Sequence, residues 1–187
     1  MSHATTRQTA ILKFCILLLT SLVSAIAVGA QQLPPGATYD VGFSPNAGAL
    51  EVVLKGVESA RSSILVAAYT FTSKPIANAL LAAQKRGVKV AVVADEIENT
   101  KGYSSTRFLA NQGVPVRLNG NYASLHDKFM VIDGQSVQLG SFNYSARAAG
   151  NNAENAMIIW NVKQLAYQYG AEWQKLWDTG TDLRAAY

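Results

Sequence analysis

Two apolar runs separated by a helical segment constrain the fold of this chain more than any other feature. Ser63–Tyr69 (SILVAAY) and Val88–Ala94 (VKVAVVA) are short and apolar, which predicts two buried strands. Between them, Pro75 stands at the first turn of a helical pattern and Gly87 ends it. Strands that alternate with helices in this way are typical of an α/β fold.

The rest of the chain continues this alternation. Asp133-Gly134-Gln135 predicts a hairpin turn, and Pro115 places its strand near a sheet edge because proline cannot donate to a strand ladder. We therefore predict an α/β fold, a mixed β-sheet with helices on both faces, in one domain over residues 39–187. The other expected strands are Tyr39–Phe43, Val114–Leu118, Lys128–Ile132, Ser136–Leu139 and Asn155–Trp160, and the other expected helices are Asn46–Ala60, Ser104–Gln112 and Val162–Trp177.

Residues 1–30 predict a secretory signal peptide. Arg7 and Lys13 precede the apolar run Phe14–Val28, and small residues lead to a cleavage site near Ala30. An uncleaved anchor is the alternative, although the run is short for a membrane span of about 20 residues. Residues 31–38 are expected to form an exposed leader. The mature protein is expected in the periplasm or outside the cell, with no stable membrane anchor.

Removal of the signal peptide would exclude several classes of functional site in the mature protein. The only cysteine, Cys15, and one of the two histidines, His3, lie in the predicted signal peptide. The mature chain would have no disulfide, no thiol nucleophile and no metal site built from several histidines. The removed segment contains two basic residues, Arg7 and Lys13, and no acid, so the formal net charge falls from +4 to +2. That charge is weak support for nucleic-acid binding. A metal site built from carboxylates alone stays open, although the acids do not cluster in the sequence as they do in such sites.

The remaining histidine, His126, lies in the stretch whose side chains are best suited to catalysis. His126 and Lys128 are two residues apart, so on an extended segment both project to one face and Asp127 projects to the other. The predicted hairpin brings Ser141 and Asn143 toward them. A neutral imidazole can attack a phosphodiester without charge repulsion, while a lysine and an amide bind the phosphate oxygens. The stretch therefore suits attack on a phosphate ester.

The spacing of these residues resembles the signature of the phospholipase D superfamily. The single copy of the motif, the short chain and the export signal resemble the bacterial Nuc-type endonucleases of that superfamily. The resemblance extends over most of the predicted domain, from Ile64 to Trp160. The matching positions are His126-x-Lys128, then Asp133 after four residues, then Gly140-Ser141-x-Asn143 after six, and finally Glu154, which matches an acid of the family.

This resemblance implies a phosphodiesterase that needs no metal and no cofactor and acts as a homodimer. His126 would attack phosphorus to form a phosphohistidine, and the partner's His126 would protonate the leaving oxygen and then activate water. Lys128, Asn143 and Ser141 would bind the phosphate, and Glu154 would orient His126. The implied substrate is DNA, cut with little sequence preference; RNA and phospholipid stay open as substrates.

Several acids also have plainer interpretations. Asp133 directly precedes a glycine and is more typical of a structural turn residue than of a substrate contact. Glu154, taken alone, is typical of a charge at a strand end. Asp95, Glu96 and Glu98 form a short acidic run that predicts a solvated loop.

Three functions fit this sequence. The first is an exported endonuclease. The second is a phospholipase D that hydrolyses phospholipid head groups, although no extra segment supplies the apolar entrance a lipid enzyme needs. The third is a catalytically silent nucleic-acid-binding envelope protein, which the presence of His126, Lys128 and Asn143 disfavours.

Overall fold

The computed structural model describes residues 29–100 and 103–186. The predicted signal peptide therefore lies almost wholly outside the described residues. Residues 29–37 contain no helix or strand. No helix in the described ranges is long and apolar enough to cross a membrane.

One eight-stranded mixed sheet organises residues 38–182. Its strand order is β1-β7-β6-β5-β2-β3-β4-β8. β2, β3 and β4 run parallel, and every other pair is antiparallel. The strands are β1 (Thr38–Ser44), β2 (Ser63–Ala68), β3 (Lys89–Asp95), β4 (Val116–Asn119), β5 (Phe129–Ile132), β6 (Ser136–Gly140), β7 (Glu154–Trp160) and β8 (Thr181–Asp182).

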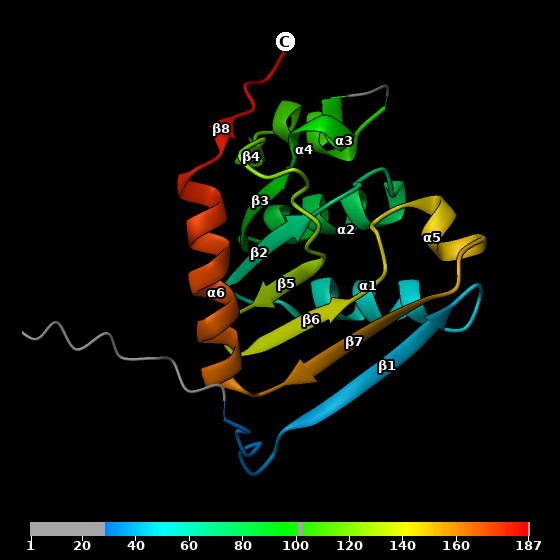
Figure 1. The fold of residues 1–187 in the computed structure, drawn as a ribbon, viewed down its shortest axis with the longest axis vertical. Helices are drawn as coiled ribbons and strands as arrows, with labels where there is room; N and C mark the ends of the chain where they lie inside the picture. Colours follow the sequence, from blue (N-terminus) through cyan, green and yellow to red (C-terminus); the bar gives the residue numbers. More distant parts are fainter. Residues whose placement is uncertain (1–28, 101–102, 187) are drawn as a thin grey trace, which may run out of the picture. The chain divides into compact units, whose positions relative to one another are not determined.

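Helices cover both faces of the sheet, as predicted (Figure 1). One face packs into the larger apolar cluster with α1, α2 and α4, and the other face packs against α6. Apolar residues at helical spacing explain this packing, since Ile76, Ala77, Leu80 and Ala83 of α2 are all buried. The helices are α1 (Ala49–Ser59), α2 (Lys74–Lys85), α3 (Glu96–Thr100), α4 (Ser105–Asn111), α5 (Ala146–Gly150) and α6 (Lys163–Asp178).

The predicted hairpin is present between β5 and β6. Asp133 and Gly134 both have positive φ, 54° and 64°, and the Gln135 N–H donates to the Ile132 carbonyl at 3.1 Å. Two adjacent residues with positive φ match the right-handed twist of the paired strands. The turn fixes the register that runs from Ile132–Ser136 to Phe129–Leu139.

Three short elements were not predicted, and one prediction was wrong. α3 and α5 are five residues long and β8 is two, too short to show a period in the sequence. The expected solvated loop at Asp95, Glu96 and Glu98 is instead the buried end of β3 followed by α3. Asp95 is only 3% exposed, and its carboxylate caps α3 by accepting from the Glu98 N–H at 2.9 Å, whereas Glu96 is exposed as expected. β4 lies next to the edge strand β8, in agreement with the expectation from Pro115.

Candidate active site

His126 and Lys128 lie in the extended segment that enters β5, and their side chains meet. The Lys128 ammonium lies 3.0 Å from His126 Nδ1 and donates to the His126 carbonyl at 2.6 Å. The imidazole is exposed, whereas Lys128 is only 7% exposed. A reactive ring therefore stands at the surface with a nearly buried cation directly beside it.

This contact determines where a neutral His126 ring carries its proton. An ammonium group has only donors, so Nδ1 accepts and the ring proton lies on Nε2. In this arrangement Nε2 can give a proton but cannot attack. Attack by Nε2 requires Lys128 to release Nδ1, and a phosphate that binds the ammonium would provide the competing partner.

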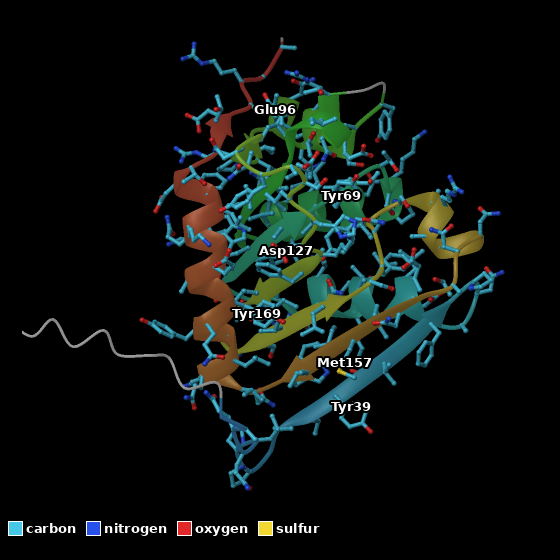
Figure 2. The ribbon with its side chains drawn as sticks, viewed as in Figure 1. Tyr39, Tyr69, Glu96, Asp127, Met157 and Tyr169 are labelled. Carbon is cyan, nitrogen blue, oxygen red and sulfur yellow. The ribbon has the colours of Figure 1, made fainter. Side chains whose placement is uncertain are left out.

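Tyr69, just beyond β2 (Figure 2), packs against both His126 and Lys128. Its ring centroid lies 4.4 Å from that of His126 at an interplanar angle of 53°. Lys128 Nζ lies 4.9 Å from the same ring, within range of a cation–π contact. Burial lowers the pKa of Lys128 from its ordinary value, while the charges of Asp127 and Glu154 act in the opposite direction. A cation that has lost part of its hydration gains more from an incoming phosphate.

Ser141 and Asn143 leave the sheet at the edge from which His126 and Lys128 enter it. One further step in the Phe129–Leu139 register sets Gly140 beside Lys128. Gly140 has φ 149°, and a Cβ there would collide with the Asn155 carbonyl. Only glycine allows β6 to approach β7 so closely before the chain turns toward Asn143.

Glu154 begins β7 and is held by neighbours other than His126. Its carboxylate accepts from Ser141 Oγ at 2.6 Å and from Asn152 Nδ2 at 2.9 Å. The Ser141 hydroxyl also accepts from the Asn155 N–H at 3.1 Å. No hydrogen bond joins the two described residues Glu154 and His126, so the expected orienting contact is not made in this arrangement. Glu154 reaches the pair through its charge on Lys128.

The Asn143 side chain has one buried atom without a partner. Its Oδ1 is buried and has no hydrogen-bond partner. An amide oxygen only accepts hydrogen bonds, so a phosphate oxygen would be bound by the Nδ2 group of Asn143 and not by this atom. Asn143 lines an open polar cavity of about 370 Å³, together with Thr70, Thr72, Glu98, Ser145, Ala146, Arg147 and Asn152.

Asp133 lies at the opposite end of β5 from His126. Its carboxylate accepts from the N–H groups of Arg61, Ser62 and Ser63 at 2.7–3.2 Å, and from the Ser62 hydroxyl at 2.9 Å. Burial would raise the pKa of Asp133, but these hydrogen bonds outweigh it and lower the pKa. Asp133 therefore ties the hairpin to the connection before β2 and lies outside the candidate site.

Asp127 lies within reach of the charges of Glu172 and Lys175 on α6, in agreement with the predicted alternation. The pKa of Asp127 is raised from its ordinary value, mainly by burial and also by the charge of Glu172 on α6. On the same side, Phe129 packs edge-on against Tyr169 of α6 at 5.0 Å. This side of the segment anchors it to the helix and leaves the other side free for substrate.

A buried polar network, missed in the sequence, holds the loop that carries His126. Asp95 Oδ2 accepts from the N–H of Leu125, the residue before His126, at 2.8 Å. Asn99 Nδ2 donates to the carbonyls of Tyr69 and Asp95 at 2.6 and 2.8 Å. The network thus holds the backbone next to His126, and that of Tyr69, at the end of β3. A usable signal was present, because Asp95 directly follows a buried strand, where functional residues of α/β sheets gather.

Metal-ligating side chains do not cluster in the described part of the chain. Within residues 29–100 and 103–186, no three His, Cys, Asp or Glu residues are placed to hold one ion together.

Comparison with known proteins identifies the family. The sequence profile described as "Cardiolipin synthase, PLD-like domain" matches residues 53–177. The chain belongs to the phospholipase D superfamily. Its named relatives include a phospholipase D and a mitochondrial cardiolipin hydrolase. The motif residues His126, Lys128 and Asp133 all fall within the matched range.

Two solved superfamily structures of the Nuc type are similar over nearly their whole length. Nuc from Salmonella typhimurium is 41% identical with a TM-score of 0.77, covering 80% of this chain and 99% of that one. NucT from Helicobacter pylori is 26% identical with a TM-score of 0.69, covering 79% and 99%. A protein of Rickettsia felis named phospholipase D is 34% identical over 131 residues, which is 70% of this chain but only 65% of that protein. The aligned part is therefore less than two thirds of the rickettsial protein.

Proposed function

We propose that this protein is an exported, metal-independent endonuclease that cuts DNA with little sequence preference. The observation that carries the proposal is the exposed His126 imidazole in contact with the nearly buried Lys128 cation. The similarity to Nuc of Salmonella typhimurium over 99% of that chain supports nucleic acid as the substrate class. The polar cavity beside Asn143 leaves room for the groups that flank a phosphodiester.

In the first step, Lys128 moves from Nδ1 of His126 to a non-bridging phosphate oxygen, while the Asn143 amide binds another. Once Lys128 has left Nδ1, that nitrogen takes up a proton from water while Nε2 releases its proton to water, and the free lone pair of Nε2 attacks phosphorus. A P–N bond forms and the P–O bond to the leaving group breaks. The partner's His126 gives its Nε2 proton to the leaving oxygen, so the reaction uses one proton donor and one nucleophile of the same residue type.

In the second step, water replaces histidine on phosphorus. The partner's His126, now a base, takes a proton from water as the oxygen attacks. The P–N bond breaks and its electron pair returns to His126. A homodimer therefore supplies both histidines, and Ser141 supports the pocket through its hydrogen bond to Glu154.

A phospholipase D activity is the second candidate, because the rickettsial relative carries that name. The same phosphohistidine chemistry would apply to a phospholipid head group. The two candidates differ in the leaving group and in what must dock beside the site, so a substrate comparison separates them.

The test is a side-by-side assay on plasmid DNA, RNA and phosphatidylcholine with excess chelator present. We expect nicked and linear plasmid with no loss of rate in chelator, and little release of choline. Release of choline at a higher specific rate than plasmid cleavage would favour the lipid enzyme. Failure to act on any of the three would favour the silent binding protein.

Export is tested on the protein recovered from its host. We propose cleavage near Ala30, with the mature protein in the periplasm or outside the cell. Mass measurement of the recovered protein should show a chain that begins close to Gln31. An intact N-terminus in the membrane fraction would instead identify an anchor.

A further inference from the structure

The polar cavity beside Asn143 is large enough to hold a ligand of its own. Its volume of about 370 Å³ lies within the range of about 300–1,000 Å³ that is usual for small-molecule sites. Its wall comes from the segment after β2, from α3, from the turn after β6 and from α5. These parts meet at the edge of the sheet where β2 and β6 end (Figure 1). A group that enters the cavity therefore lies next to the phosphate that Asn143 is expected to bind.

The lining of the cavity carries one charge of each sign, Glu98 on α3 and Arg147 on α5. A second phosphate is a poor occupant, because the Glu98 carboxylate would repel it. A polar ring without net charge, with both donors and acceptors, suits the lining better, and in DNA the nucleobases are such rings. Uncharged hydroxyl and amide groups line much of the remaining wall, on Thr70, Thr72, Ser145 and Asn152.

Hydrogen bonds hold the wall of the cavity in place without a ligand. The Thr72 N–H donates to the Tyr144 carbonyl at 2.8 Å. Asn99, which follows Glu98 on α3, accepts from the Phe71 N–H at 3.2 Å. Because the wall is already ordered, a base that enters loses little free energy in forming its site.

Glu98 and Arg147 both keep hydrogen-bonding capacity for a ligand. The half-buried Glu98 carboxylate accepts one side-chain hydrogen bond within residues 29–100 and 103–186, from Thr70 Oγ1 at 3.3 Å. The Arg147 side chain is exposed, and no hydrogen bond joins it to another described residue. Guanine matches both groups, since its N1–H and N2 amino group can donate to a carboxylate, while its O6 and N7 accept from a guanidinium. Thymine has a single donor, N3–H, and adenine has an acceptor beside its amino group.

We propose that this cavity binds an unpaired guanine base next to the phosphate that is cut, and that Glu98 and Arg147 select it. This proposal rests on the proposed function and deepens it, because it names the nucleotide that flanks the favoured cuts. A preference at one flanking position still leaves cuts throughout a long DNA. The guanine must be unpaired, since Glu98 contacts the edge that pairs with cytosine in a duplex.

The test determines the ends that are produced from single-stranded oligonucleotides of random sequence, cut to a small extent in excess chelator. Glu98→Gln is compared with Glu96→Gln, which makes the same change on the same helix at an exposed residue outside the cavity lining. We expect guanine to be enriched about tenfold at one position beside the cut for the wild type and for Glu96→Gln. Glu98→Gln should use the four bases about equally. Its rate on an oligonucleotide without guanine should equal that of the wild type, because Glu98 does not bind the phosphate.

Glu98→Gln should fold, because the new amide oxygen can still accept from Thr70. Its thermal unfolding midpoint should therefore stay close to that of the wild type. If the variant fails to fold, Arg147→Gln changes an exposed side chain and should lower the guanine preference in the same way.

Binding to His126→Ala measures the cavity without cleavage. A fluorescent strand with one guanine among thymines should bind about tenfold more tightly than the all-thymine strand, and adding Glu98→Gln should remove the difference. Equal cleavage beside all four bases by the wild type, or a guanine preference that persists in Glu98→Gln, would overturn the proposal and leave the nuclease intact. If the wild type cuts no DNA but His126→Ala shows the guanine difference that depends on Glu98, the base site stands and the nuclease proposal falls.

Discussion

The two ends of strand β5 carry opposite kinds of polar group. At one end the Asp133 carboxylate accepts from three backbone N–H groups and one hydroxyl. At the other end the His126 imidazole is exposed, and Lys128 is nearly buried with no carboxylate hydrogen-bonded to it. The four residues of β5 thus separate two kinds of group. The Asp133 carboxylate has its hydrogen bonds filled by the protein, whereas His126 and Lys128 can still bind a ligand.

This difference separates stability from function within one motif. A carboxylate with several short hydrogen bonds stabilises the fold and has little left for a ligand. A nearly buried cation beside an imidazole costs stability and gains interaction energy when an anion arrives. The same family signature thus joins a structural residue, Asp133, to the reactive pair His126 and Lys128.

The largest expected effect comes from His126→Ala. Loss of the nucleophile should lower plasmid cleavage by at least about a thousandfold. Since the ring is exposed, the thermal unfolding midpoint should stay near the wild-type value. Rates of single-turnover cleavage, measured beside a thermal scan, check both statements. Near-normal cleavage in this variant would show that the reactive end of β5 has been misplaced.

Lys128→Met should lower cleavage by about a hundredfold, since one preorganised charge on the phosphate is lost. Methionine has a similar length without the desolvation cost of a buried ammonium. The free energy of unfolding should therefore stay equal or rise. Denaturant unfolding and nicking rates on the same preparation measure both signs. A strongly destabilised variant would mean that Lys128 serves the fold as Asp133 does.

Asp133→Ala should show the reverse pattern. Removing an acceptor of several backbone N–H groups should cost about 2–3 kcal/mol of stability. Cleavage per folded molecule should change little, because Asp133 lies outside the candidate site. Denaturant titration gives the first quantity, and activity normalised to the folded fraction gives the second. A large fall in that normalised activity would break the contrast between the two ends.

The smallest effect is expected in the acid stability of the protein. Hydrogen bonds to Asp133 lower its pKa in the folded state. A lowered pKa contributes stability above the unfolded-state value of about 4, and that contribution is lost as the pH falls through the folded-state pKa. Stability should thus decrease below about pH 4 more steeply in the wild type than in Asp133→Asn. If the two proteins lost stability equally as the pH falls, the Asp133 carboxylate would not be a source of acid sensitivity.

Much of this contrast could be predicted from residue patterns. The strands at Ser63–Ala68 and Lys89–Asp95 follow from uninterrupted apolar runs, and the hairpin follows from Asp133-Gly134. Alternation also predicted that Lys128 and Asp127 project to opposite sides. These features depend on local sequence, which a single chain displays directly.

Contacts between distant segments could not be predicted in the same way. Asp95 looked like a surface acid, yet it is buried because the loop before His126 folds over it. Glu154 was expected to meet His126 but is bound by Ser141 and Asn152, while Lys128 takes the imidazole. These hydrogen-bond partners depend on how the loops at the ends of four strands pack together. The local sequence pattern does not contain that information.

A covalent-trapping experiment tests the central claim, attack by His126 on phosphorus, most directly. End-labelled DNA is mixed with excess protein in chelator, and the reaction is stopped within one turnover in alkaline denaturant, which preserves phosphohistidine. We expect labelled DNA attached to the wild-type protein and none attached to His126→Ala. Cleavage by the wild type without any labelled protein, or an equal adduct in His126→Ala, would contradict it.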